Sequence, residues 1–190
     1  MAHGGTQPTP DPDPTPPAMD AGEGLDHLFT AAYDELRRLA AAIRRDDPAA
    51  TISPTALVNE AWLKLAASPD LRPASRLHFR RIAGRAMRQV LVEAARRRNA
   101  TKRGGGLAPV TFEEGLDEAP ASSEQVLALD EALARLARLS PRQAQMVECR
   151  FFGGLEVTEV AELLGISEAT VLRDWRAARA WLAAELRRPA

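Results

Sequence analysis

The stretch LEVTEVAELLGISEATVLRDWR, residues 155–176, constrains the fold of this chain more than any other. Its first half spaces apolar residues three and four apart, as a helix packed on a core requires. Gly165 then permits the left-handed backbone that commonly ends a helix, and Ser167 is a strong N-cap for a second helix. A short helix, a glycine turn and a second helix in this order predict a helix-turn-helix.

The second predicted helix has an apolar stripe and a basic outer side. The stripe is Val171, Trp175, Ala178, Leu182 and Leu186. On the outer side, Arg173, Arg176 and Arg179 could reach phosphates or guanine edges, which favours a DNA-binding role. The alternative is an ordinary helical hairpin in an all-α core, with the arginines forming a solvated face.

The composition and the residue pattern exclude several classes of function for this chain. The formal net charge of −1 excludes a uniformly basic nucleic-acid coat, although the charges are segregated along the chain. The single cysteine, Cys149, excludes an internal disulfide and a cysteine-rich metal site. His3, His27 and His78 are scattered, and no arrangement of nucleophile, base and carboxylate is evident. We therefore expect no catalytic residues, no metal and no cofactor, and a protein that is not an enzyme.

The hydropathy pattern indicates the cellular location to expect for this protein. No run approaches the eighteen or more apolar residues of a membrane span, and the N-terminus lacks a charged-then-apolar signal pattern. We expect a soluble, cytoplasmic protein without a membrane partner.

The N-terminal part of the chain divides into a tail and a first domain. Residues 1–24 hold six prolines and four acids but no Lys or Arg, and we expect them to be disordered. A helix is predicted from Leu25, a second from the cap Ser53 and the first-turn Pro54, and a third from about Ser75. Residues 25–103 are therefore predicted to form a first helical domain.

The third predicted helix has an unusual charge. Between Arg76 and Arg103 there are ten Lys or Arg residues and one acid, Glu93. An ordinary solvated helix would mix signs, so this density of positive charge favours contact with a nucleic acid.

A glycine-rich and acidic segment, residues 104–122, is predicted to be a flexible linker. It could fold back on the basic helix or thread a basic channel of a partner, and the sequence leaves both open. A second domain follows over residues 123–188, with a capping box predicted at Ser140 and a helix from there to Phe152. Its last two helices are the predicted helix-turn-helix. The predicted fold class is all-α, with two small helical domains.

Over residues 25–186 the chain resembles the small, two-domain extracytoplasmic-function (ECF) sigma factors of bacterial RNA polymerase. The segment SPTALVNEAWLKLA looks like the region 2 helix that docks on the polymerase clamp helices. The segment HFRRIAGRAMRQVLVEAARRR looks like the promoter-melting helix. Within the ECF-like group, the chain is most similar to a subfamily whose third helix ends in such a phrase, followed by a Lys/Arg-Gly-Gly segment.

The resemblance implies a non-catalytic specificity subunit that binds core RNA polymerase and directs transcription initiation at a specific set of promoters. Region 2 would open the minus-ten element and region 4 would read the minus-thirty-five element. The residues implied to bind polymerase are Leu57, Asn59, Glu60 and Lys64. The residues implied to bind promoter DNA are Arg85, Arg88, Gln89, Arg96 and Arg97 in the basic helix, and Ser167, Glu168, Ala169, Thr170, Leu172, Arg173 and Arg176 in the helix-turn-helix.

Other functions remain open at this point. A conventional helix-turn-helix regulator would be a two-fold dimer on an inverted repeat, whereas a sigma-like subunit is expected to be a monomer when free. An enzyme acting on DNA would need catalytic residues that the sequence does not offer. An anti-sigma factor is a further partner that the resemblance leaves open.

Overall fold

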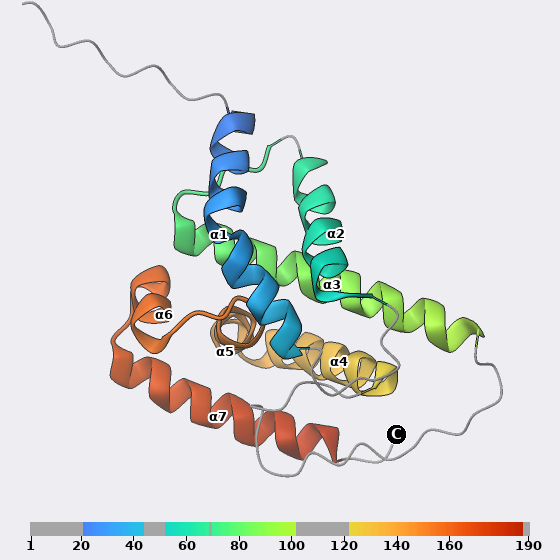
Figure 1. The fold of residues 1–190 in the computed structure, drawn as a ribbon. Helices are drawn as coiled ribbons and strands as arrows, with labels where there is room; N and C mark the ends of the chain where they lie inside the picture. The colour runs from blue at the N-terminus through green and yellow to red at the C-terminus, as the bar shows by residue number, and fades with distance from the viewer. Residues whose placement is uncertain (1–20, 44–51, 69, 102–121, 188–190) are drawn as a thin grey trace, which may run out of the picture.

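The computed structural model describes residues 21–43, 52–68, 70–101 and 122–187, and within these ranges it contains helices and no strand (Figure 1). The all-α prediction is confirmed. The elements are α1 (Ala21–Ile43), α2 (Pro54–Ala66), α3 (Arg76–Thr101), α4 (Ser123–Leu139), α5 (Pro141–Val147), a π-helical turn η1 (Glu148–Phe152), α6 (Val157–Leu164) and α7 (Glu168–Leu186). The expected disorder of the tail and the linker concerns residues that lie almost entirely outside the described ranges.

Helices α1, α2 and α3, here called the N-terminal group, pack around one core. The start of α2 follows the prediction: Pro54 occupies the first turn, and the Ser53 hydroxyl accepts a hydrogen bond from the Ala56 N–H at 3.1 Å. Helix α1 begins at Ala21, four residues before the predicted Leu25. The buried members of this core are Leu25, Ala32, Leu36, Ala40, Leu57, Val58, Ala61, Leu65, Phe79, Ala83, Ala86, Met87 and Val90.

Helices α4 to α7 with η1, here called the C-terminal group, surround a second core. A capping box does occur in this group, but at the start of α4 and not at α5, where it was predicted. Ser122 and Gln125 exchange the two hydrogen bonds, whereas Ser140 makes no side-chain cap bond. Ser140 ends α4 and begins α5 at once, and its ψ of 86° differs from the 163° of Ser122. At this backbone angle the Ser140 hydroxyl makes no cap hydrogen bond to the first amides of α5.

The helix predicted to run to Phe152 ends there, but its last turn is π-helical. The Gly153 N–H donates to the Glu148 carbonyl and the Leu155 N–H to the Cys149 carbonyl, each at 3.0 Å. A π-turn inserts an extra residue into a helix and changes the direction in which the following side chains project. This turn, which ends at Phe152, packs on α3.

The two groups meet along α3. One side of α3 packs on α1 and α2, and another packs on α4, η1 and α6. Leu39 and Leu91 pack against both cores. In Figure 1, α7 lies on the far side of α4 and α5 from the N-terminal group, so the two predicted DNA-contacting helices, α3 and α7, are separated by a layer of helices.

Candidate nucleic-acid and polymerase interfaces

The turn between α6 and α7 has the predicted geometry. Gly165 adopts φ 64° and ψ 37°, the left-handed conformation that glycine takes without steric cost. The Ile166 N–H donates to the Ala161 carbonyl at 3.1 Å, which closes the end of α6. The Ser167 hydroxyl accepts from the Thr170 N–H at 3.3 Å and so caps α7. The helix-turn-helix is confirmed.

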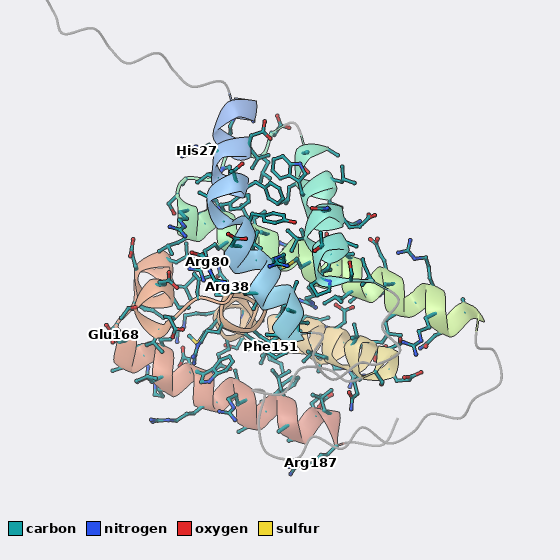
Figure 2. All side chains as sticks on the ribbon, in the orientation of Figure 1. His27, Arg38, Arg80, Phe151, Glu168 and Arg187 are labelled. Atoms are coloured by element: carbon teal, nitrogen blue, oxygen red, sulfur yellow. The ribbon has the colours of Figure 1, made fainter. Side chains whose placement is uncertain are left out.

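Helix α7 divides into an inner and an outer side, as the stripe predicted. Val171, Ala178 and Leu182 are fully buried, Trp175 is nearly so, and Leu186, the last residue of the predicted stripe, is half-buried. Figure 2 shows Glu168 and Arg187 at opposite ends of this helix. The predicted groove-facing residues Ser167, Glu168, Ala169, Leu172, Arg173 and Arg176 are all exposed, and Thr170 is half-buried.

Two contacts that the sequence analysis did not identify brace α7. The Asp174 side chain, only 7% exposed, accepts from the Arg142 guanidinium of α5 at 2.8 Å and 2.6 Å. The Arg173 Nε lies 3.7 Å from the other oxygen of the same carboxylate. The Arg150 guanidinium of η1 lies 4.5 Å from the ring centroid of Trp175 of α7, in cation–π geometry. The sequence shows that Arg142 and Asp174 are charged, but their positions along the chain do not show that they pair with each other.

The basic residues of α3 do not all face the same way. Arg85, Gln89, Arg96 and Arg97 are exposed, as a DNA contact requires. Arg88 is not: its side chain is 15% exposed and points into the C-terminal group. In this arrangement Arg88 presents little surface to DNA.

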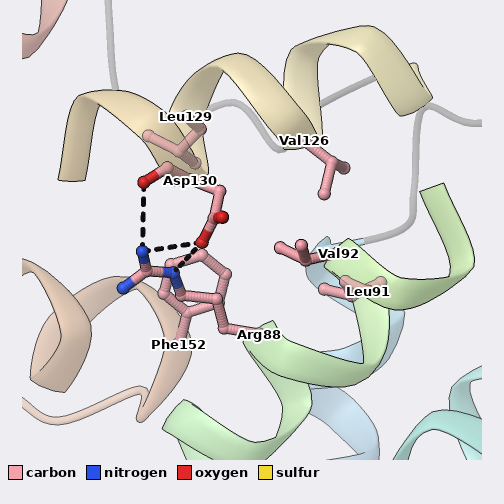
Figure 3. A pocket seen from close by; sticks show the side chains of 7 residues that line it. All are labelled: Arg88, Leu91, Val92, Val126, Leu129, Asp130 and Phe152. Carbon is pink, nitrogen blue, oxygen red and sulfur yellow. Dashed lines mark hydrogen bonds and ion pairs between the residues drawn. The ribbon is translucent and has the colours of Figure 1, made fainter. Parts of the chain in front are cut away.

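Figure 3 shows what holds Arg88. Its Nε and Nη2 donate to the Asp130 carboxylate of α4 at 3.0 Å and 2.8 Å, and Nη2 also donates to the Asp130 carbonyl at 3.2 Å. Its Nη1 donates to the Glu148 carboxylate of η1. Two acids from different helices therefore neutralise one arginine, with the apolar side chains of Leu129 and Phe152 beside it.

Arg80, which the sequence analysis did not single out, makes a second link of the same kind. Its side chain is 12% exposed and lies where α1, α3 and α6 come together (Figure 2). It donates to the Glu159 carboxylate at 2.7 Å and to the Gly154 carbonyl at 2.6 Å, with Glu35 of α1 at 3.5 Å. Glu159 also accepts from the Glu156 N–H at 2.8 Å, so the same carboxylate caps α6.

The residues implied to bind polymerase lie on α2, and they differ in how far their side chains are exposed. Asn59 and Glu60 are exposed, and Lys64 donates to Glu93 of α3 at 2.8 Å. Leu57 has an exposed fraction of 0%, because its position in the helix turns it toward α1 and α3, and in this structure it offers no surface to a partner. The exposed apolar side chain on this helix is Leu63, at 61%, four residues after Asn59 and on the same side.

The described residues include one cysteine and no cluster of metal-ligand residues. Among them, no group of three or more His, Cys, Asp or Glu residues is arranged to hold a metal ion. Cys149 is fully buried, and burial raises the pKa of its thiol to about 12, so that it stays protonated at neutral pH. No helix among the described residues is both long enough and apolar enough to cross a membrane.

Together, the braced helix-turn-helix, the exposed arginines of its second helix and the basic α3 define a helix-turn-helix DNA-binding protein. The model of one family matches most of the chain: residues 20–188 match the ECF sigma factor family, and the chain belongs to that family. No curated protein and no solved structure matches the chain significantly. The family consists of transcription-initiation factors and is not a class of enzymes.

Proposed function

We propose that this chain binds core RNA polymerase and directs it to a specific set of promoters. The observation that carries the proposal is the exposed outer side of α7, which presents Arg173 and Arg176 from a helix whose inner side packs on the core. A rigid helix with donors on one side is what major-groove reading requires.

In this proposal α7 reads the minus-thirty-five element. Arg173 lies in the second turn of the helix, where its planar fork can reach O6 and N7 of a guanine. Arg176 lies one turn further along the same side and contacts a phosphate. The Arg142–Asp174 bond fixes α7 against α5, so the two arginines are presented from a fixed orientation.

Helix α3 contacts DNA around the minus-ten element through its exposed side. Arg85 and Gln89 are one turn apart on that side, and Arg96 and Arg97 extend it toward the end of the helix. Cations along a helix attract the phosphate backbone whatever its sequence, so this side positions the duplex, and specificity comes from α7.

Helix α2 supplies the polymerase contact. Asn59 and Glu60 form a polar surface next to the exposed Leu63, a combination of apolar anchor and polar rim that is typical of protein interfaces. Leu63 takes the apolar role that the resemblance gave to Leu57.

The test is reconstitution with purified core polymerase. The full-length protein should co-elute with core polymerase, and the complex should transcribe from a subset of a promoter library from which core polymerase alone makes no product. A chain with Asn59 and Glu60 both replaced by alanine is the matched control for docking. Failure to form a complex, or a two-fold footprint of the isolated protein on an inverted repeat, would refute the proposal and favour the dimeric regulator.

A further inference from the structure

Helix α7 carries an exposed leucine on its outer side. Leu172 is 39% exposed, and it belongs neither to the C-terminal core nor to the partly buried side chains that pack on that core. Among the described residues, Leu63 and Leu139 are the other large hydrophobic residues that are exposed. Burial within the chain therefore does not account for an apolar residue at this position.

Leu172 lies in the middle of the surface that α7 presents to the outside. Glu168, Leu172 and Arg176 follow one another at intervals of four residues and share one side of the helix, and Ala169 and Arg173 lie beside them. All five residues are exposed, and Figure 2 labels Glu168 at the start of the helix. With a rise of about 1.5 Å per residue, Leu172 is about 6 Å along the axis from each of its two charged neighbours. It therefore occupies the centre of the side that the proposed function places in the major groove.

The polar side chains next to this position are already bonded within the protein. The Thr170 hydroxyl lies 2.9 Å from the Ser167 hydroxyl, which also accepts from the Thr170 N–H at the start of α7. The Asp174 carboxylate accepts from Arg142 of α5 at 2.8 Å. Neither Thr170 nor Asp174 can turn toward DNA without breaking a bond that holds α7. In the second turn of the helix, Leu172 and Arg173 are therefore the exposed side chains that can reach a base.

The chemistry of the major groove restricts what a leucine can contact there. Guanine, adenine and cytosine present hydrogen-bond donors and acceptors on this edge, whereas thymine presents an acceptor and its 5-methyl group. A leucine placed against a donor or acceptor removes water from that group and offers no hydrogen bond in return, which costs free energy. Against a methyl group, it removes two apolar surfaces from water, which is favourable. Leu172 in the groove is therefore matched to thymine and opposed to the other three bases.

We infer that Leu172 determines specificity by packing on the 5-methyl group of a thymine in the upstream element, beside the guanine that Arg173 reads. Consecutive residues are about 3.8 Å apart, close to the spacing of about 3.4 Å between base pairs, so the two contacts fall on the same or on neighbouring base pairs. The inference rests on the proposed function, because it assumes that the outer side of α7 enters the major groove. It adds the second base that this helix selects and the group by which that base is recognised.

Replacing thymine by uracil tests this contact, because uracil pairs in the same way and lacks only the methyl group. Each thymidine of the upstream element is replaced in turn by deoxyuridine, and the affinity of the assembled holoenzyme for each promoter duplex is measured. With the wild-type chain, one position should lose affinity by about fourfold, which corresponds to the roughly 0.8 kcal/mol gained by burying one such group. With Leu172→Ala, deoxyuridine at that position should leave the affinity unchanged.

A methylated cytosine separates the methyl group from the hydrogen-bonding edge of the base. Cytosine at the selected position should weaken binding by the wild-type chain, since it has an amino donor and no methyl group. 5-Methylcytosine keeps that donor and restores the methyl group, so the wild-type chain should bind it about fourfold more tightly than cytosine. Leu172→Ala should bind the two bases equally. Equal binding of the two bases by the wild-type chain would overturn the inference.

The matched control is Leu139→Ala, the same change at an exposed leucine of α4. This variant should keep the fourfold response to deoxyuridine. Leu172→Ala should keep its circular dichroism, because alanine favours a helix more than leucine does and the site is exposed. The inference is overturned if no thymine responds with the wild-type chain, or if the response persists in Leu172→Ala. It is also overturned if Leu172→Ala weakens the complex with core polymerase and keeps the response, which would make Leu172 a protein contact.

Failure of the proposed function gives a different result. If the chain does not join core polymerase, the proposed function fails. The same base replacements are then made in the duplex that the full-length chain alone selects from a random library. A response to deoxyuridine that is lost in Leu172→Ala supports the contact in that duplex too, and the absence of such a response overturns it.

Discussion

The bond between Arg142 and Asp174 should show an asymmetric cost when either partner is removed. Arg142→Ala leaves the Asp174 carboxylate, 7% exposed, without its two donors, and only the Arg173 Nε at 3.7 Å remains near it. Leaving a buried charged acceptor unsatisfied costs about 1–3 kcal/mol or more, and breaking a fully buried pair about 3–5 kcal/mol. Asp174 remains slightly exposed to water, and Arg173 lies near its carboxylate. We therefore expect Arg142→Ala to lower the free energy of unfolding by about 2–3 kcal/mol.

The reverse substitution should be milder. In Asp174→Ala the Arg142 side chain, 54% exposed, recovers water around its guanidinium, so the loss resembles that of a surface ion pair, about 1 kcal/mol. The double variant leaves no buried charge and should cost about as much as Asp174→Ala alone. The two single costs should therefore fail to add, as expected for residues in contact.

Urea denaturation followed by tryptophan fluorescence measures these costs, because Trp175 and Trp181 both lie on α7. Arg138→Ala, at an exposed arginine of α4, is the control and should change the free energy of unfolding by less than about 0.5 kcal/mol. If Asp174→Ala costs as much as Arg142→Ala, or if the single costs add in the double variant, the carboxylate is not held buried by Arg142 and the reasoning fails.

Three further predictions concern the turn, the reading helix and the docking helix. Gly165→Ala should cost about 1–2 kcal/mol in urea denaturation because its φ of 64° strains any residue with a Cβ; a change of a few tenths would contradict this. In a salt titration of the assembled holoenzyme, Arg173→Ala should cost about 1–3 kcal/mol and relax preference at one base position, whereas Arg176→Ala should weaken all sequences alike and lower the salt slope by about one unit. Uniform losses in both variants would make Arg173 a phosphate contact. Replacing Asn59 and Glu60 together should weaken core polymerase binding with unchanged circular dichroism, and a loss of helicity would make these residues structural.

The sequence determined those features that depend on neighbours along the chain. Ser53, Gly165 and Ser167 act within four residues of themselves, so their capping and turn roles could be read directly and are confirmed. The apolar stripe of α7 could also be predicted from the sequence, because apolar residues that repeat every 3.6 residues lie on one side of a helix, and that side is the one that packs on a core. Ser140 shows the limit: its residue type favours a cap, but the backbone angle that decides the bond depends on how α4 and α5 pack.

The tertiary structure decided what depends on residues far apart in sequence. Arg80, Gly84 and Arg88 read as members of one basic helix, yet they meet Glu159, Phe152 and Asp130, which are 42 to 79 residues away. Net charge and helical periodicity carry no information on such pairings, because any exposed acid could serve as partner until the two cores are placed. Leu57 and Leu63 differ in the same way: both are leucines of α2, and only the packing of α1 and α3 against one side of that helix buries the first and leaves the second exposed. Local patterns specify which helices form, and packing specifies which of their charges remain free to meet DNA.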